Sequence, residues 1–182
     1  MRKLLAAGMI PIGRAAMVEF AFGGWGTNPI CGTPRNPWDM QTHRIPGGSS
    51  SGSGVAVAAG LAPAAIGSDT GGSVRIPAAL NGIVGLKPTY GRISLKGCFP
   101  LSSTLDSIGP MTRTVADAAL LLDALCGPDA SDPATRLAPA LKPGAWQGLR
   151  TQGMRVAVMR EEDFPIPLDA ESQAAYDQAK EA

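Results

Sequence analysis

Short apolar stretches, separated by glycine, proline and polar residues, run along the whole 182-residue chain. Their lengths and periodicities predict helices and strands in alternation. The predicted helices cover residues 2–8, 55–59 and 114–127, and another begins at residue 169. The predicted strands cover residues 9–12, 64–66, 83–86 and 154–159, the last of a parallel type. This alternation is typical of an α/β fold, in which helices pack against a sheet.

The segment that begins at Thr114 has the clearest helical pattern. Asp117 follows Thr114 by three residues and predicts a weaker version of a capping box at the start of the helix. Gly127 is expected to end the helix. One face is predicted to pack on the core, and it carries Val115, Ala118, Leu122 and Leu125. Residues 128–148, rich in proline, alanine and aspartate, are expected to form a surface loop.

Two segments rich in glycine and serine, Gly47–Gly54 and Gly67–Ser73, lie on either side of one apolar stretch. Glycine allows positive φ and a close approach of the backbone to a ligand, at a cost in chain entropy. Simple connectors have little use for two such hydroxyl-rich segments, so we interpret them as two walls of one active site. Ser51 or Ser53 is expected to cap the helix between them, and Gly60 to end it.

The second segment is expected to place a serine at a strand–turn–helix junction. The chain is expected to turn through Ser68–Gly72 and to present Ser73, and Pro77 suits the first turn of the helix that follows. A nucleophile elbow places its serine at such a junction, next to backbone N–H groups that lack partners. Such N–H groups can stabilise a developing oxyanion.

Three other interpretations of these segments fit less well. A flexible linker would not alternate with apolar stretches such as VAVAAG. A phosphate-binding P-loop needs Gly-Lys-Ser/Thr after its glycines, and neither segment has this continuation. The triplet at residues 69–71 matches that of the aspartic proteases, but Gly67 and Ser68 separate it from the apolar strand that normally comes directly before it.

The charge and composition exclude several classes of function. With 16 Lys and Arg against 15 Asp and Glu, the net charge of +1 leaves no electrostatic footprint for nucleic acid. No apolar run approaches the roughly 20 residues of a membrane span, and no signal peptide precedes the first predicted helix. The cysteines, Cys31, Cys98 and Cys126, fit neither a zinc site nor a disulfide framework. We therefore expect a cytoplasmic protein that contacts neither membrane nor nucleic acid directly.

Several longer motifs, taken in order, resemble the amidase signature family. They are GGSSSGSG at 47–54, GSDTGGSVRIPA at 67–78 and GIVGLKPTYGRIS at 82–94, together with NPWD at 36–39 and LDSIGPMTRTVADAALLLD at 105–123. The resemblance extends from about Leu4 to about Phe164, and the spacing of Ser49 and Ser73 agrees with the signature. It implies an α/β fold in which helices cover both faces of a mixed β-sheet.

The resemblance assigns the catalytic roles. It makes Ser73 the nucleophile and Ser49 a second catalytic serine, which relays a proton and follows a cis peptide bond from Gly48. It assigns the oxyanion hole to backbone N–H groups, those of Thr70, Gly71, Gly72 and Ser73. No metal or organic cofactor is implied.

Further residues are expected to support these loops or to line the substrate pocket. By resemblance, Ser50, Asp69 and Arg75 support the serine loops. The glycine-rich, aromatic segment FAFGGWG would lie close to the catalytic serines, so its candidate pocket residues are Phe22, Gly23 and Trp25. Simple core packing of the two aromatic side chains is an equally well supported alternative.

A serine hydroxyl is a poor nucleophile until a base accepts its proton, so the base must be identified as well. The single histidine, His43, lies in a polar segment, and we interpret it as a surface or structural residue. The resemblance implies instead a buried neutral lysine, whose pKa desolvation lowers. Lys3 lies in a segment that the family places after its catalytic lysine, and Lys87 belongs to a structural block. Arg14 stays protonated and cannot act as a base.

We therefore expect residues 1–182 to be a partial amidase signature domain. It would lack the N-terminal segment that carries the catalytic lysine, and also the C-terminal part. The expected function of the parent protein is hydrolysis of linear amide C–N bonds in a small-molecule substrate, through an acyl-enzyme at Ser73. The 182-residue chain alone is expected to have little or no turnover.

Two alternatives to a stand-alone amidase stay open. The first is a component of a tRNA-dependent amidotransferase, in which the same chemistry would release ammonia from glutamine for partner subunits. The second is a non-catalytic relative that has lost its lysine. The expected protein partners are accordingly amidotransferase subunits or a second copy in a homodimer.

Overall fold

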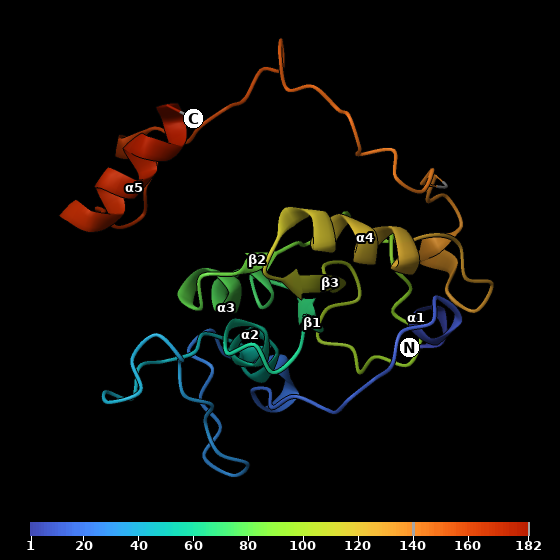
Figure 1. The fold of residues 1–182 in the computed structure, drawn as a ribbon, viewed down its shortest axis with the longest axis horizontal. Coiled ribbons are helices and arrows are strands. Elements are labelled where there is room, and N and C mark those ends of the chain that lie inside the picture. The colour runs from blue at the N-terminus through green and yellow to red at the C-terminus, as the bar shows by residue number, and fades with distance from the viewer. Residues whose placement is uncertain (140, 182) are drawn as a thin grey trace. The chain divides into compact units, whose positions relative to one another are not determined.

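The computed structural model describes residues 1–139 and 141–181, which form two compact units, one up to Gln147 and one from Gly148 on (Figure 1). In chain order the first unit contains α1 (Arg2–Ala6), the 3₁₀ turn η1 (Glu19–Ala21), α2 (Ser51–Ala58), β1 (Ala64–Asp69), α3 (Arg75–Leu80), β2 (Val84–Gly85), β3 (Ser107–Thr112), α4 (Val115–Leu125) and the 3₁₀ turn η2 (Pro133–Thr135). The second unit contains the 3₁₀ turn η3 (Glu161–Asp163) and α5 (Ala170–Glu181).

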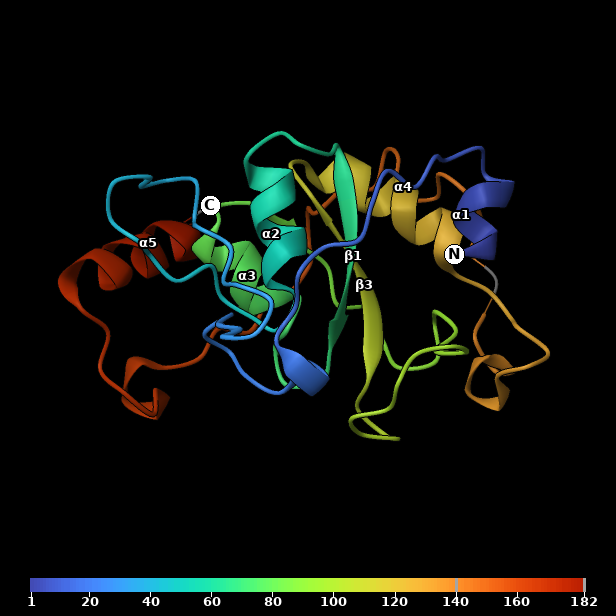
Figure 2. The same ribbon diagram turned by 90° about the horizontal axis from the view of Figure 1, so that it is seen from below.

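The three strands form one antiparallel sheet in the order β1-β3-β2. Helices lie on both sides of it, since α2 and α4 flank β1 and β3 from opposite sides in both views (Figures 1 and 2). The α/β fold with helices on both faces is thus confirmed, although the three strands pair only antiparallel. In the register of β1 and β3, Asp69 faces Ser107, so the turn after β1 and the loop before β3 meet at one end of the sheet.

Backbone segments approach closely over the centre of this sheet, where two glycines face each other. A Cβ atom on Gly67 would lie 2.6 Å from the Ser50 Oγ atom, and one on Gly109 would lie 2.2 Å from the Leu86 carbonyl oxygen. Only glycine therefore lets Ser50, the residue before α2, come this close to β1, and Leu86, the residue after β2, this close to β3. The central cluster of the core consists of Val74, Ala78 and Met111, with Ile83 packed against it.

The helix after Thr114, α4, has the predicted cap and follows its predicted packing face in part. The Thr114 hydroxyl caps it by accepting a hydrogen bond from the Asp117 N–H group at 3.1 Å. Its buried residues are the predicted Ala118 and Leu125 together with Leu121, whereas the predicted Leu122 is only half-buried. Val115, in contrast, is 73% exposed.

The first serine-rich segment becomes helical earlier than expected, because α2 begins at Ser51. The expected side-chain caps are wrong: the hydroxyl of Ser53 donates instead to the Ile66 carbonyl at 2.9 Å, and that of Ser51 to the Ala16 carbonyl at 3.4 Å. Gly60, with φ of 72°, follows the end of the helix as expected.

Strand predictions succeed only where a partner strand lies beside the segment. The strand expected at 64–66 extends to Asp69 as β1, and the one at 83–86 shortens to β2. The strands expected at 9–12 and 154–159 are wrong, since both segments are exposed and pair with no strand of the described residues. The sequence analysis missed β3, because Gly109 and Pro110 in its middle are unfavourable in strands.

The second unit contains the predicted C-terminal helix. Asp169 caps α5, since its Oδ1 atom accepts a hydrogen bond from the Ser172 N–H group at 2.7 Å. Tyr176 on this helix packs edge-on against Phe164, with ring centroids 5.2 Å apart. Across the described parts of both units, every helix is too short or too polar to cross a lipid bilayer.

Candidate active site

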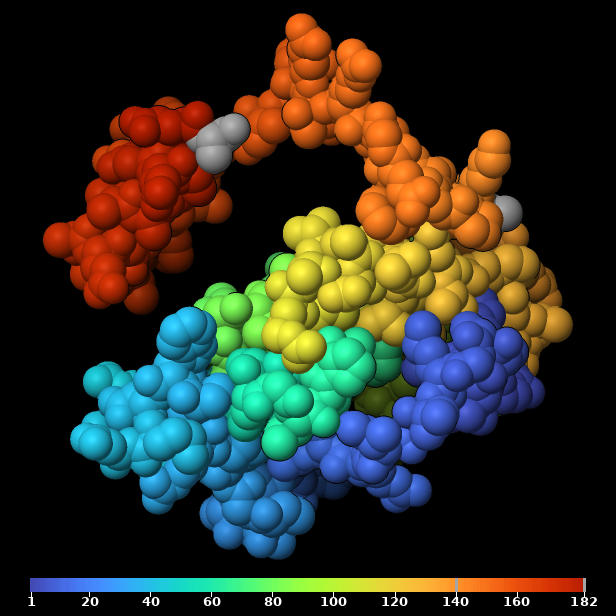
Figure 3. Space-filling view, viewed as in Figure 1, coloured from blue at the N-terminus to red at the C-terminus, as the bar shows by residue number. Residues whose placement is uncertain are grey.

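The segment that carries Ser49 is buried, and the N-terminal chain forms backbone hydrogen bonds with it. The Val18 N–H group donates to the Ser49 carbonyl at 3.0 Å, and the Gly52 N–H group donates to the Ala16 carbonyl at 2.8 Å. All residues from Pro46 to Gly54 are buried. The space-filling view shows the N-terminal chain, in blue, against α2, in teal (Figure 3). This contact leaves residues 47–52 little conformational freedom.

Ser49 has an unusual hydroxyl for a buried residue. Its side chain is fully inaccessible, and the Oγ atom has no hydrogen-bond partner among the described residues. Burying a hydroxyl without a partner costs free energy, so such groups are uncommon and often have a functional reason. The Gly48–Ser49 peptide bond is cis, which confirms that part of the expectation.

The turn that carries Ser73 has the opposite character. It joins β1 to α3, and Ser73 is half-buried. In the described part of the chain, the backbone N–H groups of Thr70, Gly71 and Ser73 donate to no protein acceptor. The Gly72 N–H group instead donates to Asp69 Oδ1 at 2.8 Å, so this expected oxyanion donor is already engaged. Three of the four expected donors therefore remain available.

Ser50 joins the two serine segments. Its backbone N–H group donates to the Ser73 carbonyl at 3.2 Å. Its hydroxyl accepts from the Ser68 N–H group at 3.1 Å and donates to the Ser68 carbonyl at 3.3 Å. The contacts of Ser50 therefore hold the start of α2 against the end of β1, next to the Ser73 turn.

The Asp69 carboxylate binds the backbone of the Ser73 turn. Its buried carboxylate accepts hydrogen bonds from the backbone N–H groups of Gly72 and Val74, the latter at 3.1 Å. Arg75 donates to it through two guanidinium nitrogens, at 2.8 and 3.0 Å. Burial alone would raise the pKa of Asp69, but these hydrogen bonds and the charge of Arg75 outweigh it and lower the pKa. Asp69 thus stays ionised and fixes the backbone between β1 and α3.

A second carboxylate, which the sequence analysis did not single out, holds the other side of the turn. The Thr70 hydroxyl donates to Asp106 Oδ1. Asp106 also accepts from the N–H groups of Leu101, at 2.8 Å, and Ser102, at 3.0 Å. The available signal was its place in the 105–123 motif, but sequence distance alone does not bring residue 106 beside residue 70.

The three predicted pocket residues do not form one pocket. Phe22 and Trp25 are 79% and 69% exposed, so neither packs in the core. Gly23 and Gly26 lie against Gly48, where a Cβ atom would come within 2.5 Å of the Gly23 carbonyl oxygen. Trp25 lines a separate depression of ≈ 660 Å³, together with Asn36, Trp38, Asp39, Thr42, His43, Arg44, Ile45 and Leu80.

The two lysines that the sequence analysis rejected as the base, Lys3 and Lys87, have other hydrogen-bond partners. The Lys3 ammonium group donates to the last carbonyls of α4 and the residues that follow it, those of Leu125, Cys126 and Gly127, at 2.8–3.0 Å. The Lys87 ammonium group donates to the Pro88 carbonyl at 2.8 Å. His43 is exposed, as expected. The contacts of Lys3 and Lys87 and the exposure of His43 agree with the expectation that none of these three residues is the base.

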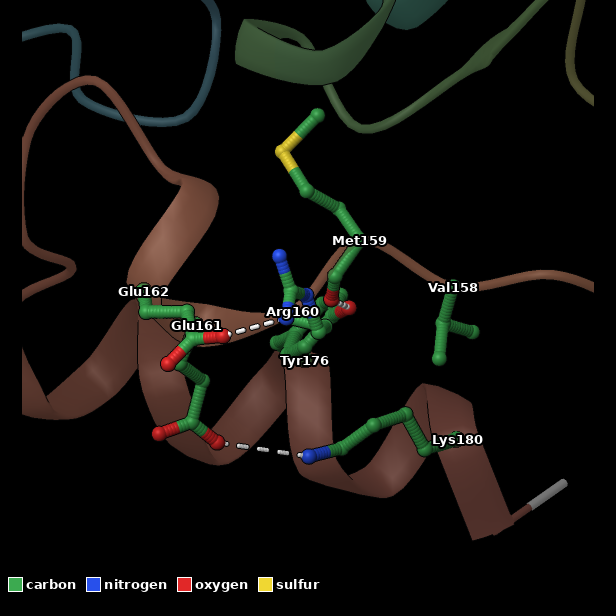
Figure 4. A pocket seen from close by; sticks show the side chains of 7 residues that line it. All are labelled: Val158, Met159, Arg160, Glu161, Glu162, Tyr176 and Lys180. Atoms are coloured by element: carbon green, nitrogen blue, oxygen red, sulfur yellow. Dashed lines mark hydrogen bonds and ion pairs between the residues drawn. The ribbon is translucent and has the colours of Figure 1, made fainter.

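Another pocket, within the second unit, contains no serine, threonine or cysteine among its lining residues. It has a volume of ≈ 560 Å³ and is lined by Val158, Met159, Arg160, Glu161, Glu162, Tyr176 and Lys180 (Figure 4). Its charged side chains already pair, since Arg160 contacts Glu162 and Lys180 contacts Glu161. No group of three potential metal ligands occurs in residues 1–139 and 141–181. The serine segments are therefore the best candidate for an active site.

Comparisons with known proteins agree with this assignment. The chain matches the family described as Amidase over residues 1–182. It is 53% identical over 161 residues to a glutamyl-tRNA(Gln) amidotransferase subunit of Symbiobacterium thermophilum, and the match covers 87% of this chain and 32% of that protein. It is 55% identical over 130 residues to the protein of the same name from Cupriavidus pinatubonensis, covering 71% and 26%. The chain thus spans about a third or less of the length of these relatives.

Solved structures show the same similarity. The corresponding glutamyl-tRNA(Gln) amidotransferase subunit of Thermotoga maritima is 50% identical with a TM-score of 0.71, covering 74% of this chain and 29% of that one. The peptide amidase from Stenotrophomonas maltophilia is 47% identical with a TM-score of 0.72, covering 78% and 30%.

Proposed function

The chain belongs to the amidase family, and on that premise we propose that its parent protein hydrolyses amide C–N bonds with Ser73 as the nucleophile. One observation carries the proposal. The buried hydroxyl of Ser49 has no partner among the described residues and lies on a segment hydrogen-bonded to the Ser73 turn. In the same described residues, three N–H groups of that turn donate to no acceptor. A nucleophile, a proton relay and an oxyanion site are the parts that acyl transfer through serine needs.

In the proposed reaction, the Ser73 Oγ atom attacks the amide carbonyl carbon and forms a new C–O bond. The electron pair of the carbonyl moves to its oxygen, where the N–H groups of Thr70, Gly71 and Ser73 stabilise the negative charge. The C–N bond then breaks, and the leaving nitrogen takes a proton as ammonia or an amine. Water attacks the resulting acyl-enzyme, releases the carboxylic acid and restores the Ser73 hydroxyl.

Ser49 is the proposed proton relay between Ser73 and the base. Its Oγ atom is shielded from water, so water does not compete for the hydrogen bonds that it would form with Ser73 and the base. We propose that the base itself is a lysine outside the 182 residues, as the resemblance to the family implies. The hydrogen bonds of Lys3 and Lys87 to other groups support this proposal. We therefore propose that the residues form part of a longer amidase domain, and that the 182-residue chain alone turns over little or no substrate.

A second candidate function is favoured by the similarity to amidotransferase subunits. Identities of 53% and 55% to subunits of glutamyl-tRNA(Gln) amidotransferases support a parent protein that releases ammonia from glutamine for partner subunits. The same serine chemistry would serve both functions, since glutamine carries a linear amide. Stimulation of glutaminase activity by co-purified partner subunits distinguishes this candidate from a stand-alone amidase.

Ammonia release from amide substrates by the full-length parent protein tests the proposal. We expect Ser73→Ala and Ser49→Ala each to reduce kcat by at least about 10³-fold, because catalytic serines act as a unit with their base. Ser103→Ala is the matched control, since Ser103 is exposed and its hydroxyl has no partner in the described residues. Hydrolysis that survives Ser73→Ala contradicts the assignment. A wild-type parent without any amide hydrolysis supports a non-catalytic relative instead.

A further inference from the structure

The Thr70 side chain connects the proposed oxyanion turn to a second loop. Thr70 is the first residue of this turn, and its hydroxyl donates to Asp106 Oδ1. The antiparallel register pairs Asp69 with Ser107, so the residues that follow β1 and precede β3 are neighbours at one end of the sheet. A contact across two chain segments therefore fixes the side chain of a residue whose N–H group is a proposed oxyanion donor.

Asp106 is itself well fixed. Both of its carboxylate oxygens accept from the Ser102 N–H group at 3.0 Å, and Oδ2 also accepts from the Leu101 N–H group at 2.8 Å. Burial raises the pKa of Asp106, but hydrogen bonds from Thr70, Leu101 and Ser102 outweigh burial and lower the pKa. An ionised carboxylate only accepts hydrogen bonds, so the Thr70 hydroxyl must donate to it and is held in one orientation.

We propose that Asp106 is a positioning residue for the oxyanion turn, acting through the Thr70 hydroxyl. The inference rests on the proposed function and adds a residue that does not touch the substrate. The two ends of the turn are then held by two carboxylates, with Asp106 on Thr70 and Asp69 on Gly72 and Val74. Between these anchors, the N–H groups of Thr70 and Gly71 donate to no acceptor in residues 1–139 and 141–181.

The energetic reason is that an oxyanion site works only when its donors are aimed in advance. Donors must lie about 2.7–3.1 Å from the developing oxyanion, and losing one costs roughly 10²–10³-fold in rate. A misplacement of about 1 Å costs about 10²-fold. Releasing the Thr70 side chain should therefore slow the chemical step while leaving substrate binding nearly unchanged.

The labelling rate of Ser73 by a fluorophosphonate in the full-length parent protein tests this proposal. The phosphoryl oxygen of this reagent develops negative charge where the oxyanion would form. We expect Thr70→Val, which removes the hydroxyl at constant shape, and Asp106→Asn each to slow labelling about 10- to 100-fold. Thr70→Ser keeps the hydroxyl and should label within about threefold of the wild type, a rescue that follows from the hydrogen bond. Thr104→Val, in the same loop and exposed, is the matched control.

Three further readouts separate positioning from folding. The double variant Thr70→Val/Asp106→Asn should label no more slowly than the slower single variant, because both remove one interaction. In amide hydrolysis the loss should fall on kcat and not on KM. Denaturation midpoints identify any variant that fails to fold. If Asp106→Asn fails to fold, the comparison of labelling rates between Thr70→Ser and Thr70→Val decides the proposal.

The outcomes separate this inference from the proposed function. A wild-type protein labelled at Ser73, with Thr70→Val equally reactive, overturns the role of Asp106 and leaves the proposed function intact. If the labelling rate of the double variant falls by the product of the two single losses, the role of Asp106 is overturned as well. A wild-type parent with no label on Ser73 overturns the proposed function and, with it, the inference.

Discussion

The two serine-bearing segments differ in how the surrounding chain holds them. Residues 47–54 are fully buried, and the backbone at residues 16, 18 and 24 hydrogen-bonds to them from outside. Residues 70–73 form a turn that is partly accessible. Two carboxylates hold it, since Asp69 accepts from the Gly72 N–H group and Asp106 accepts from the Thr70 hydroxyl. The first segment is tightly packed. In the second, the N–H groups of Thr70, Gly71 and Ser73 donate to no acceptor in the described residues, whereas that of Gly72 donates to Asp69.

This difference fits the separate roles that we propose for the two serines. A nucleophile must meet its substrate, and Ser73, the proposed nucleophile, lies on the accessible turn. A proton relay works best where water cannot compete for its hydroxyl, and Ser49, the proposed relay, is fully buried. The predictions below alter one segment at a time, and the expected effects decrease from the first to the last.

Adding one methyl group to each segment should give the largest difference in the free energy of unfolding. A Cβ atom on Gly52 would lie 2.4 Å from the Ala16 nitrogen, whereas one on Gly71 meets nothing within 4 Å. We expect Gly52→Ala to lower the free energy of unfolding by about 3 kcal/mol, the upper part of the usual range for overpacking. Gly71→Ala should stay within about 0.5 kcal/mol. Urea denaturation of the two variants measures both, and equal values would contradict the contrast.

Removing the charge beneath the turn should have the next largest effect. In Asp69→Asn the amide nitrogen replaces an acceptor oxygen, so a backbone N–H group or Arg75 loses its partner. Hydrogen bonds to charged groups are worth about 1.5–3 kcal/mol each, and we expect a loss of about 2 kcal/mol. Chemical denaturation above pH 5 measures this loss. Asp117→Asn, on an exposed residue at the start of α4, is the control and should lose less.

The adjacent serines Ser49 and Ser50 should respond differently to the same substitution. Ser50→Ala removes the acceptor of the Ser68 N–H group and should cost about 1–2 kcal/mol. Ser49→Ala removes a buried hydroxyl that has no partner in the described part of the chain, so the free energy of unfolding should be unchanged or rise. Thermal unfolding of both variants measures the difference. A large loss of stability in Ser49→Ala would show that its hydroxyl has a structural partner.

The smallest effect is the pH dependence of the turn's anchor. The pKa of Asp69 is lowered from its ordinary value of 3.8, so the folded state binds the proton less readily than the unfolded state. The stabilisation is complete well above pH 3.8 and is lost as the pH falls through 3.8 and then through the lower pKa of the folded state. The difference in unfolding free energy between wild type and Asp69→Asn should therefore shrink below about pH 4. A constant difference down to pH 2 would contradict this.

The sequence predicted local features better than contacts between distant segments. The cap at Thr114 and the position of Ser73 at a strand–turn–helix junction depend on residues a few positions apart, and both are found. Asp106 was missed because its contact with Thr70 depends on the register of β1 and β3. Sequence spacing does not reveal that register, and Pro110 concealed β3 itself.

The incorrect strand predictions have a related cause. The apolar segments 9–12 and 154–159 have the composition of strands, but a strand also needs a neighbour to accept and donate its backbone hydrogen bonds. No such neighbour lies beside them in the described residues. Conversely, Ser51–Gly54 has poor helix formers, yet it begins α2, because contacts with Ala16 and β1 stabilise it there.

The most direct test of the account is to locate the covalent intermediate. The full-length parent protein is mixed with an amide substrate such as glutamine or a peptide amide, quenched in acid within a turnover, and digested for peptide mass spectrometry. The account predicts an acyl group on Ser73, absent from the Ser73→Ala variant. An acyl group on Ser49 or on any other residue would contradict it.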